Sequence, residues 1–217
     1  MKKILILVEG QTEEQFTKDI LVPVLLAKEI ILVPVIIETK EVKSGPNFKG
    51  GINSYKKIKK DLLKLLGDTH AVAVTSMIDF YGLPSDFPLY SQTGDCYSKV
   101  IAAEEAFLKD ICNDRFIPYL QLHEFEGILF TSPEDISRTM DTSGKTTPQL
   151  AEIRNRYHSP EEIDEGPSTH PSKRIEKLFP NYNKPFHGSL IASRIGIKQI
   201  LDNCPHFHQW IEKLEKC

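Results

Sequence analysis

Short apolar runs alternate with stretches of helical periodicity along the first 130 residues of the chain. The apolar runs are rich in β-branched residues, and they predict strands at 3–8, about 31–37, 71–78 and 116–122. Strands that alternate with helices are typical of βαβ units and a parallel sheet. The pattern therefore predicts an α/β fold, with a central, largely parallel sheet of about four strands flanked by helices.

Helices are expected between these strands. The first begins at Thr12, which forms a Thr-x-x-Gln capping box with Gln15, and it kinks or breaks before Pro23. The second is predicted by apolar residues spaced by three and four positions, which are Ile52, Tyr55, Ile58, Leu62 and Leu65. The third runs from about Tyr97 to Cys112.

The pattern changes after Phe130. Ser132 begins a short helix, and the stretch 141–171 is rich in Ser, Thr, Pro and charge, which predicts a mobile excursion. Helical periodicity returns at 172–178, at 189–201 and after Pro205. The predicted parts are an α/β core at 1–130, a mobile loop-rich insertion at 131–171 and C-terminal helices at 172–217 packed on the core.

The composition is that of an ordinary globular protein. Of the 217 residues, 40% are hydrophobic and 26% are charged, which suffices for a substantial core in one domain or in one domain plus a small appendage. The formal net charge of -3 predicts no general attraction to nucleic acid or membranes. The first apolar run is too short for a signal peptide or membrane span, so a cytoplasmic location is expected. The four cysteines lack a C-x-x-C pair and are expected to be reduced thiols.

Acidic residues follow two of the predicted strands. Glu9 comes directly after the first strand, and Asp79 comes directly after the third. In open α/β sheets ligands bind at the carboxyl ends of the strands, so neighbouring strands would bring both carboxylates to one binding edge. Carboxylate oxygens suit Mg²⁺ or Mn²⁺. The competing interpretation is that these residues cap helices or lie in solvated turns.

The fourth predicted strand is followed by Glu124 and Glu126. Residues two apart in an extended chain lie on one face, so both carboxylates are expected to complete the metal site or to act as a general base. The alternative is an ordinary chain turn at Glu126 and Gly127.

Lysines are concentrated around the second predicted helix, with eight lysines and two acidic residues between positions 40 and 64. A glycine-punctuated basic loop enters this helix, and backbone amides at a helix start beside lysines favour phosphate. The lysines expected to contact nucleic acid are Lys43, Lys49, Lys56, Lys57 and Lys60. Such binding would depend on salt and be largely indifferent to base sequence. The alternative is a solvated lysine surface.

Lys184 and His187 precede a predicted C-terminal helix. A lysine can stabilise negative charge on a phosphate oxygen, and a histidine can transfer a proton or bind phosphate. Both residues are therefore candidates to complete a catalytic site, although isolated lysines and histidines in loops are usually not functional.

Two other motifs are rejected from their context. Residues 144–146 (Gly-Lys-Thr) resemble the end of a P-loop, but Thr139 replaces the first glycine and no apolar strand precedes it. Residues 204–208 (Cys-Pro-His-Phe-His) contain potential zinc ligands, but the proline opens a helix in which His206 and His208 point apart. Neither motif is expected to bind a ligand.

Short motifs along almost the whole chain resemble stand-alone TOPRIM-like proteins of bacteria and archaea, which are often encoded beside an ATPase in mobile or anti-phage islands. The motifs are Val8-Glu9-Gly10-x-Thr12-Glu13, Lys49-Gly50-Gly51, Asp79-Phe80-Tyr81-Gly82-Leu83-Pro84, His123-Glu124-Phe125-Glu126 and Lys184-x-x-His187-Gly188. The resemblance extends to the TOPRIM domains of topoisomerases, primases and overcoming-lysogenisation-defect nucleases. It implies a TOPRIM/Rossmann-like fold, an Mg²⁺ site formed by the first glutamate and an Asp-x-Asp pair, phosphodiester chemistry and an ATPase partner.

The chain departs from the TOPRIM pattern at one position. The second aspartate of the Asp-x-Asp pair falls at Tyr81, and a protonated phenol cannot replace a carboxylate as a ligand of Mg²⁺. Either Glu124 or Glu126 supplies the missing oxygen, or the metal site is weakened.

These observations favour a metal-dependent nuclease in which Glu9, Asp79, Glu124 and Glu126 hold the ion and Lys184 and His187 act on the phosphate or leaving group. The alternative, favoured by Tyr81, is a non-catalytic partner subunit with an altered site. A phosphoryl-acceptor domain of the receiver type ranks last, because Glu9-Gly10 replaces the acidic pair that it needs after the first strand.

Overall fold

A computed structural model describes residues 1–37, 52, 54–141, 143–164, 166 and 169–217. Within this part of the chain, five strands form one parallel sheet in the order β2-β1-β3-β4, with β5 also paired to β3. The strands are β1 (Lys2–Val8), β2 (Ile30–Ile36), β3 (Ala71–Asp79), β4 (Phe116–Ile117) and β5 (Leu120–Gln121). The predicted α/β fold with a parallel central sheet is therefore confirmed.

The predicted strand at 116–122 is divided into the short strands β4 and β5. Pro118 lies between them and has no backbone N–H to donate to the sheet. At this point the Ser76 side chain bonds to the backbone of the neighbouring segment. Its Oγ accepts from the Tyr119 N–H at 3.1 Å and donates to the Tyr119 carbonyl at 3.0 Å. A side chain thus replaces the missing backbone pairing.

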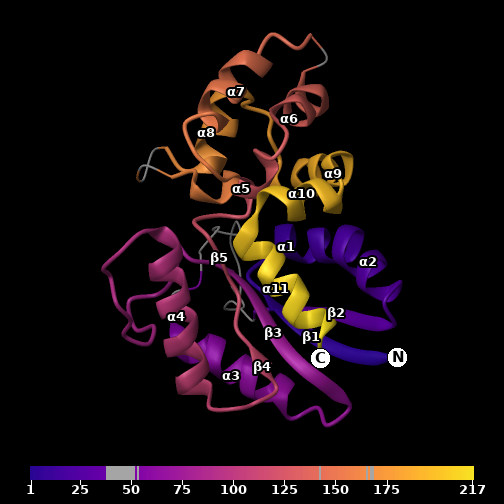
Figure 1. Ribbon diagram of the computed structural model, residues 1–217, viewed down its shortest axis with the longest axis vertical. Coiled ribbons are helices and arrows are strands. Elements are labelled where there is room, and N and C mark those ends of the chain that lie inside the picture. Colours follow the sequence, from indigo (N-terminus) through magenta and orange to yellow (C-terminus); the bar gives the residue numbers. More distant parts are fainter. Residues whose placement is uncertain (38–51, 53, 142, 165, 167–168) are drawn as a thin grey trace, which may run out of the picture.

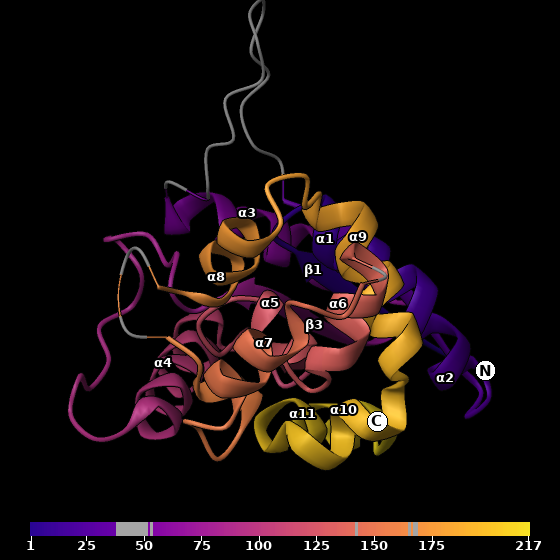
Figure 2. The same ribbon diagram turned by 90° about the horizontal axis from the view of Figure 1, so that it is seen from above.

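Helices cover both faces of the sheet. On one face, Ile4 and Ile6 of β1 join a core with α1 (Gln11–Phe16) and the C-terminal helices α9 (Lys184–Ile195), α10 (Ile197–Asn203) and α11 (Pro205–Glu215). On the other face, Leu5 and Leu7 of β1 pack with α3 (Tyr55–Leu66) and α4 (Cys96–Ile111). The α9 helix packs along α1, and the two lie side by side in both views (Figures 1 and 2).

The first helical segment differs from its prediction at its start. Gly10, not Thr12, precedes the first helical residue, and the Glu13 side chain accepts from the Gly10 N–H at 2.9 Å. The predicted capping box of Thr12 with Gln15 is therefore wrong. Before Pro23, where a kink or break was expected, the regular α-helix ends at Phe16 and the chain passes through a π-helical turn, η1 (Thr17–Leu21), into α2 (Val22–Leu26). Wider π-helical turns accommodate residues that cannot continue the α-helical hydrogen-bond ladder.

The second and third predicted helices are confirmed as α3 and α4. Four of the five apolar-stripe residues that predicted α3 are buried, namely Ile52, Tyr55, Ile58 and Leu62. The α4 helix begins after Asp95, whose side chain accepts from the Ser98 N–H at 2.8 Å. This hydrogen bond satisfies a free donor at the start of the helix.

The segment predicted to be loop-rich contains several helical elements. Within 131–171 these are α6 (Pro133–Met140), α7 (Thr147–Arg154) and the 3-10 helix η2 (Pro160–Glu162). The segment is preceded by α5 (Glu126–Leu129) and followed by the predicted helix at 172–178, which is α8 (Pro171–Leu178). Leu150 and Ile163 within this segment are fully buried in the core. In Figure 1 these helices form one end of the molecule, beyond the carboxyl ends of the strands. The short helix predicted from Ser132 is present as α6, whereas composition alone missed α7 and η2, because few apolar anchors are spread among many polar residues.

Glu161 lies in the acidic run that contributed to the prediction of a mobile segment, yet its side chain is fully buried. Its two oxygens accept from the His206 N–H at 3.0 Å and the Phe207 N–H at 2.9 Å, both in the first turn of α11. A carboxylate at a helix N-terminus satisfies free donors and interacts favourably with the helix dipole. Glu161 therefore fastens the 131–171 segment to the C-terminal helices.

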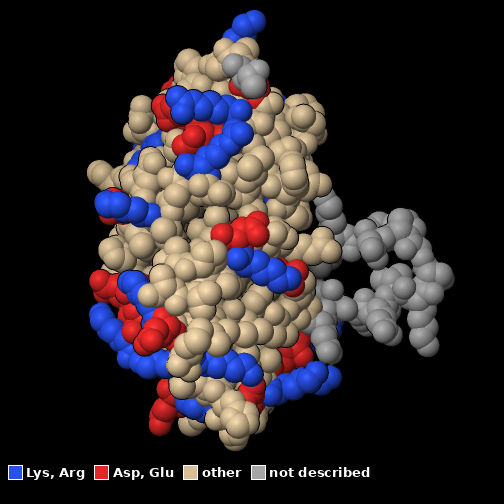
Figure 3. Space-filling model, turned by 90° about the vertical axis from the view of Figure 1, so that its right-hand side faces the viewer, with Lys and Arg blue, Asp and Glu red and all other residues tan. Residues whose placement is uncertain are grey.

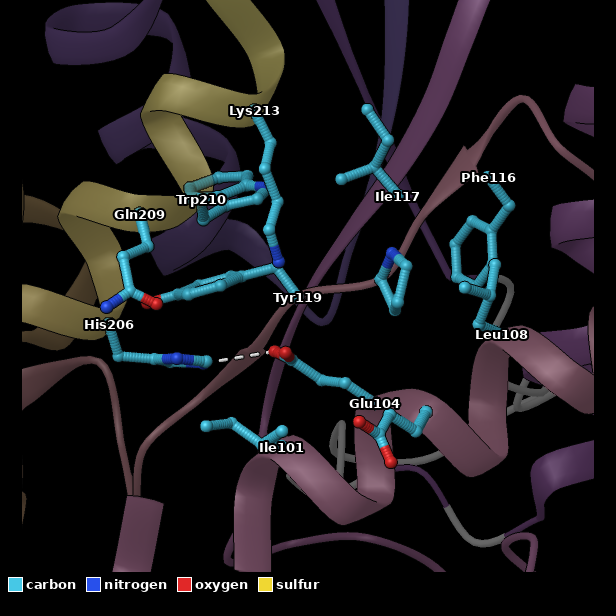
Figure 4. A pocket seen from close by; sticks show the side chains of 12 residues that line it. Ile101, Glu104, Leu108, Phe116, Ile117, Tyr119, His206, Gln209, Trp210 and Lys213 are labelled. Carbon is cyan, nitrogen blue, oxygen red and sulfur yellow. Dashed lines mark hydrogen bonds and ion pairs between the residues drawn. The ribbon is translucent and has the colours of Figure 1, made fainter. Parts of the chain in front are cut away.

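A pocket of about 380 Å³ lies between α4 and α11 at the β4 edge of the sheet (Figure 4). The His206 ring, at one side of this pocket, is 3.0 Å from the Glu104 carboxylate and 3.2 Å from the Leu120 carbonyl. His208, by contrast, is half-exposed beside Glu212. The two histidines point apart as predicted, and His206 pairs with Glu104.

None of the helices in the described ranges is both long and apolar enough to cross a membrane.

Replacing Glu161 by alanine is expected to destabilise the protein by about 3 kcal/mol, because two buried N–H donors lose a charged acceptor. Chemical denaturation of Glu161→Ala against the wild type measures this loss. The matched control is Glu152→Ala, whose side chain is 69% exposed and, among the described residues, pairs with Arg156 four positions along the chain. Its expected cost is below about 0.5 kcal/mol. Equal stabilities of the two variants would contradict the assigned role of Glu161.

Candidate functional site

The parallel pairing of β1 with β3 brings Glu9 and Asp79 together. Val8 is aligned with Met77, so the two strands end at the same level of the sheet. The Glu9 N–H donates to the Met77 carbonyl at 3.2 Å, and a Glu9 carboxylate oxygen accepts from the Asp79 N–H at 3.1 Å. The two residues converge at the carboxyl edge, as the sequence predicted.

Glu124 and Glu126 join this edge by a route that the sequence did not reveal. The chain leaves β5 at Gln121, takes a left-handed turn at His123 (φ 58°) and enters α5 at Glu126. The predicted extended segment with both glutamates on one face is therefore wrong. An Asp79 oxygen nevertheless accepts from the Phe125 N–H at 3.0 Å and holds this turn beside the end of β3.

Lys184 connects the two glutamates to the C-terminal helices. Its ammonium lies 3.2 Å from the Glu126 carboxylate and 3.9 Å from the Glu124 carboxylate. The other Glu124 oxygen accepts from the Ser172 N–H at 3.0 Å, in the first turn of α8. Residues from α8 and α9 therefore complete a site that begins on the sheet.

Glycine at position 188 allows α9 to come this close. A Cβ atom there would lie 3.1 Å from the Phe125 ring and 3.4 Å from the Tyr182 hydroxyl. The contact with the Phe125 ring is tighter than packed side chains normally accept, so Gly188 lets the α9 backbone lie close to this ring.

Glu13 is a member of the cluster that the sequence analysis did not select. Its side chain is only 7% exposed and accepts from the Gly10 N–H. It was missed because the helix start was assigned to Thr12 and Gln15. The available signal was its position four residues after Glu9, one helical turn beyond the end of the first strand.

Acidic groups outnumber basic groups in this cluster. Among the described residues it contains five carboxylates and one ammonium group, namely Glu9, Glu13, Asp79, Glu124 and Glu126 with Lys184. Glu13, Glu124 and Glu126 are buried, whereas Glu9 and Asp79 retain partial exposure.

Burial and repulsion by neighbouring carboxylates raise the pKa values of Glu9, Glu13, Asp79 and Glu126. Burial raises the pKa of Asp79 well above its usual value, and the charges of Glu9 and Glu13 raise it further. Burial also raises the pKa of Glu9, and it raises the pKa values of Glu13 and Glu126 to about 7. Burial alone would lower the pKa of Lys184, but the charge of Glu126 and its acidic neighbours raises it overall. Lys184 is therefore firmly protonated, while the carboxylates lack sufficient positive charge.

The donor chemistry of the cluster fits a hard divalent cation, which binds carboxylate oxygens. In the described ranges no three His, Cys, Asp or Glu side chains are arranged to hold one ion as they stand. Backbone N–H groups occupy one oxygen each of Glu9, Asp79 and Glu124. These side chains would therefore have to rotate to bind a metal ion. The surplus of acidic groups in the cluster favours such a cation.

Tyr81 does not contribute to the carboxylate cluster. Its side chain is 45% exposed and its ring packs against the His170 ring, with centroids 4.9 Å apart. Where the TOPRIM pattern has a second aspartate, this chain therefore has an exposed aromatic ring and no carboxylate.

His187 lies in the first turn of α9, but it is oriented differently from Lys184. Its Nδ1 accepts from the Asn183 N–H at 2.8 Å, and its ring packs between the rings of Tyr182 and Phe186. In the described part of the molecule it forms no hydrogen bond or ion pair with the carboxylates. Its predicted catalytic role therefore has less geometric support than that of Lys184.

The predicted nucleic-acid lysines are only partly described. Lys43 and Lys49 lie outside the described residues, whereas Lys56, Lys57 and Lys60 are on the first half of α3. The Tyr55 N–H at the start of this helix donates to Asp86, which follows β3, at 2.7 Å. The start of α3 therefore lies beside the loop that follows β3.

The face that carries α2 and α9 has a mixed distribution of charged side chains. Figure 3 shows acidic and basic side chains interspersed across the described residues of this face, without one continuous basic patch. Its mixed charge gives no preference for a polyanion.

The raised carboxylate pKa values predict that metal-free protein is less stable at pH 8 than at pH 6. A carboxylate whose pKa is raised to about 7 by folding, as for Glu13, stabilises the folded state while protonated. This contribution disappears as the pH rises through 7. Chemical denaturation at pH 6 and pH 8 gives the change in the free energy of unfolding between the two pH values. This change should be about 1 kcal/mol smaller in Glu13→Gln than in the wild type, and the amide oxygen that the substitution introduces can still accept from the Gly10 N–H.

The exposed substitution Glu152→Gln controls for the loss of a carboxylate, and it should leave the pH dependence unchanged. If Glu13→Gln retained the full wild-type difference between pH 6 and pH 8, the assigned protonation of Glu13 would be wrong.

Comparison with known proteins gives a family and one similar solved structure. The C-terminal region of the Burkholderia pseudomallei OLD protein is similar with a TM-score of 0.47 and 15% sequence identity, over 99% of each chain. A search of curated proteins finds no match. The model of the domain of unknown function DUF4276 matches residues 8–215, and the chain therefore belongs to the DUF4276 family.

Proposed function

We propose that this protein is a metal-dependent nuclease of TOPRIM type that uses Mg²⁺ or Mn²⁺. The observation that carries the proposal is the cluster of acidic side chains at the carboxyl edge of the sheet, with Lys184 as its counter-charge. Buried like charges are costly, and proteins retain them chiefly where a ligand or a reaction uses them. The sequence motifs that resemble TOPRIM proteins contain these same residues.

Each part of the cluster has a distinct role in this proposal. Glu9 and Asp79, which are partly exposed, would hold the metal ion, and Glu124, Glu126 or Glu13 would complete its shell or accept a proton. The ion would activate water and offset negative charge on the phosphate. Lys184, held by Glu126, is placed to bind a phosphate oxygen or stabilise charge on the leaving group.

The proposed reaction is hydrolysis of a phosphodiester. Oxygen from water bonds to phosphorus, the bond from phosphorus to the leaving oxygen breaks, and a proton passes to that oxygen. Lys56, Lys57 and Lys60, together with Lys43 and Lys49, would bind neighbouring backbone phosphates. The resemblance also leads us to propose a partner ATPase, which could control access to the site.

Conservative substitution of the two strand-end carboxylates is expected to abolish nuclease activity. Purified protein is incubated with plasmid, single-stranded DNA and RNA in Mg²⁺ or Mn²⁺, with and without the partner ATPase. Glu9→Gln and Asp79→Asn should each lower the cleavage rate by more than about 100-fold, because a metal ligand supplies several kcal/mol. Glu152→Gln should cleave at the wild-type rate. Cleavage that survives in both site variants would place the active site elsewhere.

Metal binding is also expected to stabilise the fold independently of any substrate. A divalent ion present at ~100 times its dissociation constant adds about 2.7 kcal/mol, or roughly 5–10 °C in a protein of this size. Thermal unfolding with Mn²⁺ or Mg²⁺ should show this shift in the wild type and in Glu152→Gln, but not in Asp79→Asn. An unshifted wild type over the millimolar range would exclude the proposed ion.

A second candidate function is that of a non-catalytic partner subunit. The observation that favours it is the absence of a preformed three-ligand metal group in the described ranges, together with the tyrosine at position 81. This function predicts no cleavage of any substrate even with the partner ATPase, but continued binding of nucleic acid or of the ATPase. The cleavage assay above distinguishes the two functions.

A further inference from the structure

Tyr81 presents an aromatic ring to solvent beside the carboxylate cluster. Its backbone N–H donates to the His123 carbonyl at 3.1 Å, which fixes the start of the loop after β3 against the turn that follows β5. Nearly half of the side chain is exposed, at 45%. The backbone around this exposed ring is thus anchored at the end of the sheet.

The Tyr81 ring is supported by a second ring. His170, directly before α8, is only 7% exposed, and its centroid lies 4.9 Å from that of Tyr81 with 39° between the planes. His170 Nδ1 is in turn 3.3 Å from the Gly166 carbonyl. A tyrosine that packs on a buried neighbour loses less side-chain entropy when a ligand contacts it than a freely rotating one does.

This pair of rings adjoins the acidic cluster. His170 Nε2 lies 3.7 Å from a Glu124 oxygen, and the other Glu124 oxygen is held by the Ser172 N–H at 3.0 Å. Tyr81 itself is two residues beyond Asp79 in the chain. The Tyr81 ring is therefore linked to Glu124 through His170, next to where the cluster would bind a phosphate.

An exposed aromatic ring can bind a nucleobase by stacking, with a contribution of about 1–3 kcal/mol per base. In a duplex both faces of each base are already stacked on neighbouring pairs, so the ring can reach only a base that is unpaired or flipped out. A tyrosine also recognises every base similarly, since each has a π-face. The position of Tyr81 thus favours a single strand without selecting its sequence.

We propose that Tyr81, supported by His170, stacks on an unpaired base next to the phosphate bound by the carboxylate cluster, and that the substrate is single-stranded nucleic acid. This proposal rests on the proposed nuclease function, which it extends from the reaction to the substrate class. It also gives the departure from the TOPRIM pattern a role, because the residue that cannot bind metal contacts the substrate instead.

The test measures base stacking without requiring cleavage. A single-stranded oligonucleotide that contains 2-aminopurine is titrated with the protein in a buffer that contains Ca²⁺. Quenching of the 2-aminopurine fluorescence reports base stacking, and its dependence on protein concentration gives the affinity. A duplex of the same sequence is titrated in parallel. Tyr81→Ala should weaken binding of the single strand by about 5- to 100-fold and remove the quenching, which corresponds to 1–3 kcal/mol. Tyr81→Phe should behave as the wild type.

The matched control is Phe186→Ala, which removes another exposed aromatic ring, 65% exposed on α9, whose ring contact is His187. It should leave both quenching and affinity unchanged. The proposal is overturned if the wild type does not quench the probe, if Tyr81→Ala binds like the wild type, or if Phe186→Ala loses as much affinity. It is also overturned if Tyr81→Ala weakens binding of the duplex equally.

Cleavage assays on the same proteins separate this proposal from the proposed function. If Glu9→Gln abolishes cleavage while Tyr81→Ala leaves single-strand cleavage unchanged, the nuclease function stands and the stacking role fails. If the probe is quenched through Tyr81 while no variant cleaves, the stacking role stands without catalysis. Unfolding midpoints within about 2 °C of the wild type confirm that the variants are folded.

Discussion

The parallel pairing of β1 with β3 is the constraint on which the candidate site depends. Because Val8 and Met77 are aligned, the next residues of the two strands meet at one edge, and Glu9 lies against the backbone of Asp79. A shift of one residue would turn every β1 side chain to the opposite face and would move apolar residues such as Ile6 and Leu7 between the two cores. The register that buries the core therefore also fixes the acidic pair.

Placing several carboxylates at one edge has a cost that the rest of the fold offsets. Backbone N–H groups of Gly10, Asp79, Phe125 and Ser172 each donate to a carboxylate of the cluster, and Lys184 adds a positive charge. These donors come from distant parts of the sequence. The raised pKa values show that the compensation is incomplete. A site left with excess negative charge is suited to a cation, which is the physical basis of the proposed function.

The C-terminal half of the chain completes this site. The α8 helix contributes the Ser172 N–H to Glu124, and α9 contributes Lys184 because Gly188 lets it approach Phe125. Glu161 and the ion pair of Glu104 with His206 hold α11 in place against the same assembly. The division of the sequence into a core, an insertion and a terminal extension therefore does not separate the functional residues.

The sequence by itself determined the strands β1, β2 and β3, the helices α3 and α4, and the convergence of Glu9 with Asp79. These features follow from local periodicity and from the rule that parallel strands end at one edge. Only the tertiary structure decided how Glu124 and Glu126 reach the site, that Glu13 joins it, and that Tyr81 faces solvent against His170. The physical reason is that these arrangements depend on contacts between residues far apart in the chain, such as Lys184 with Glu126, which no local pattern encodes.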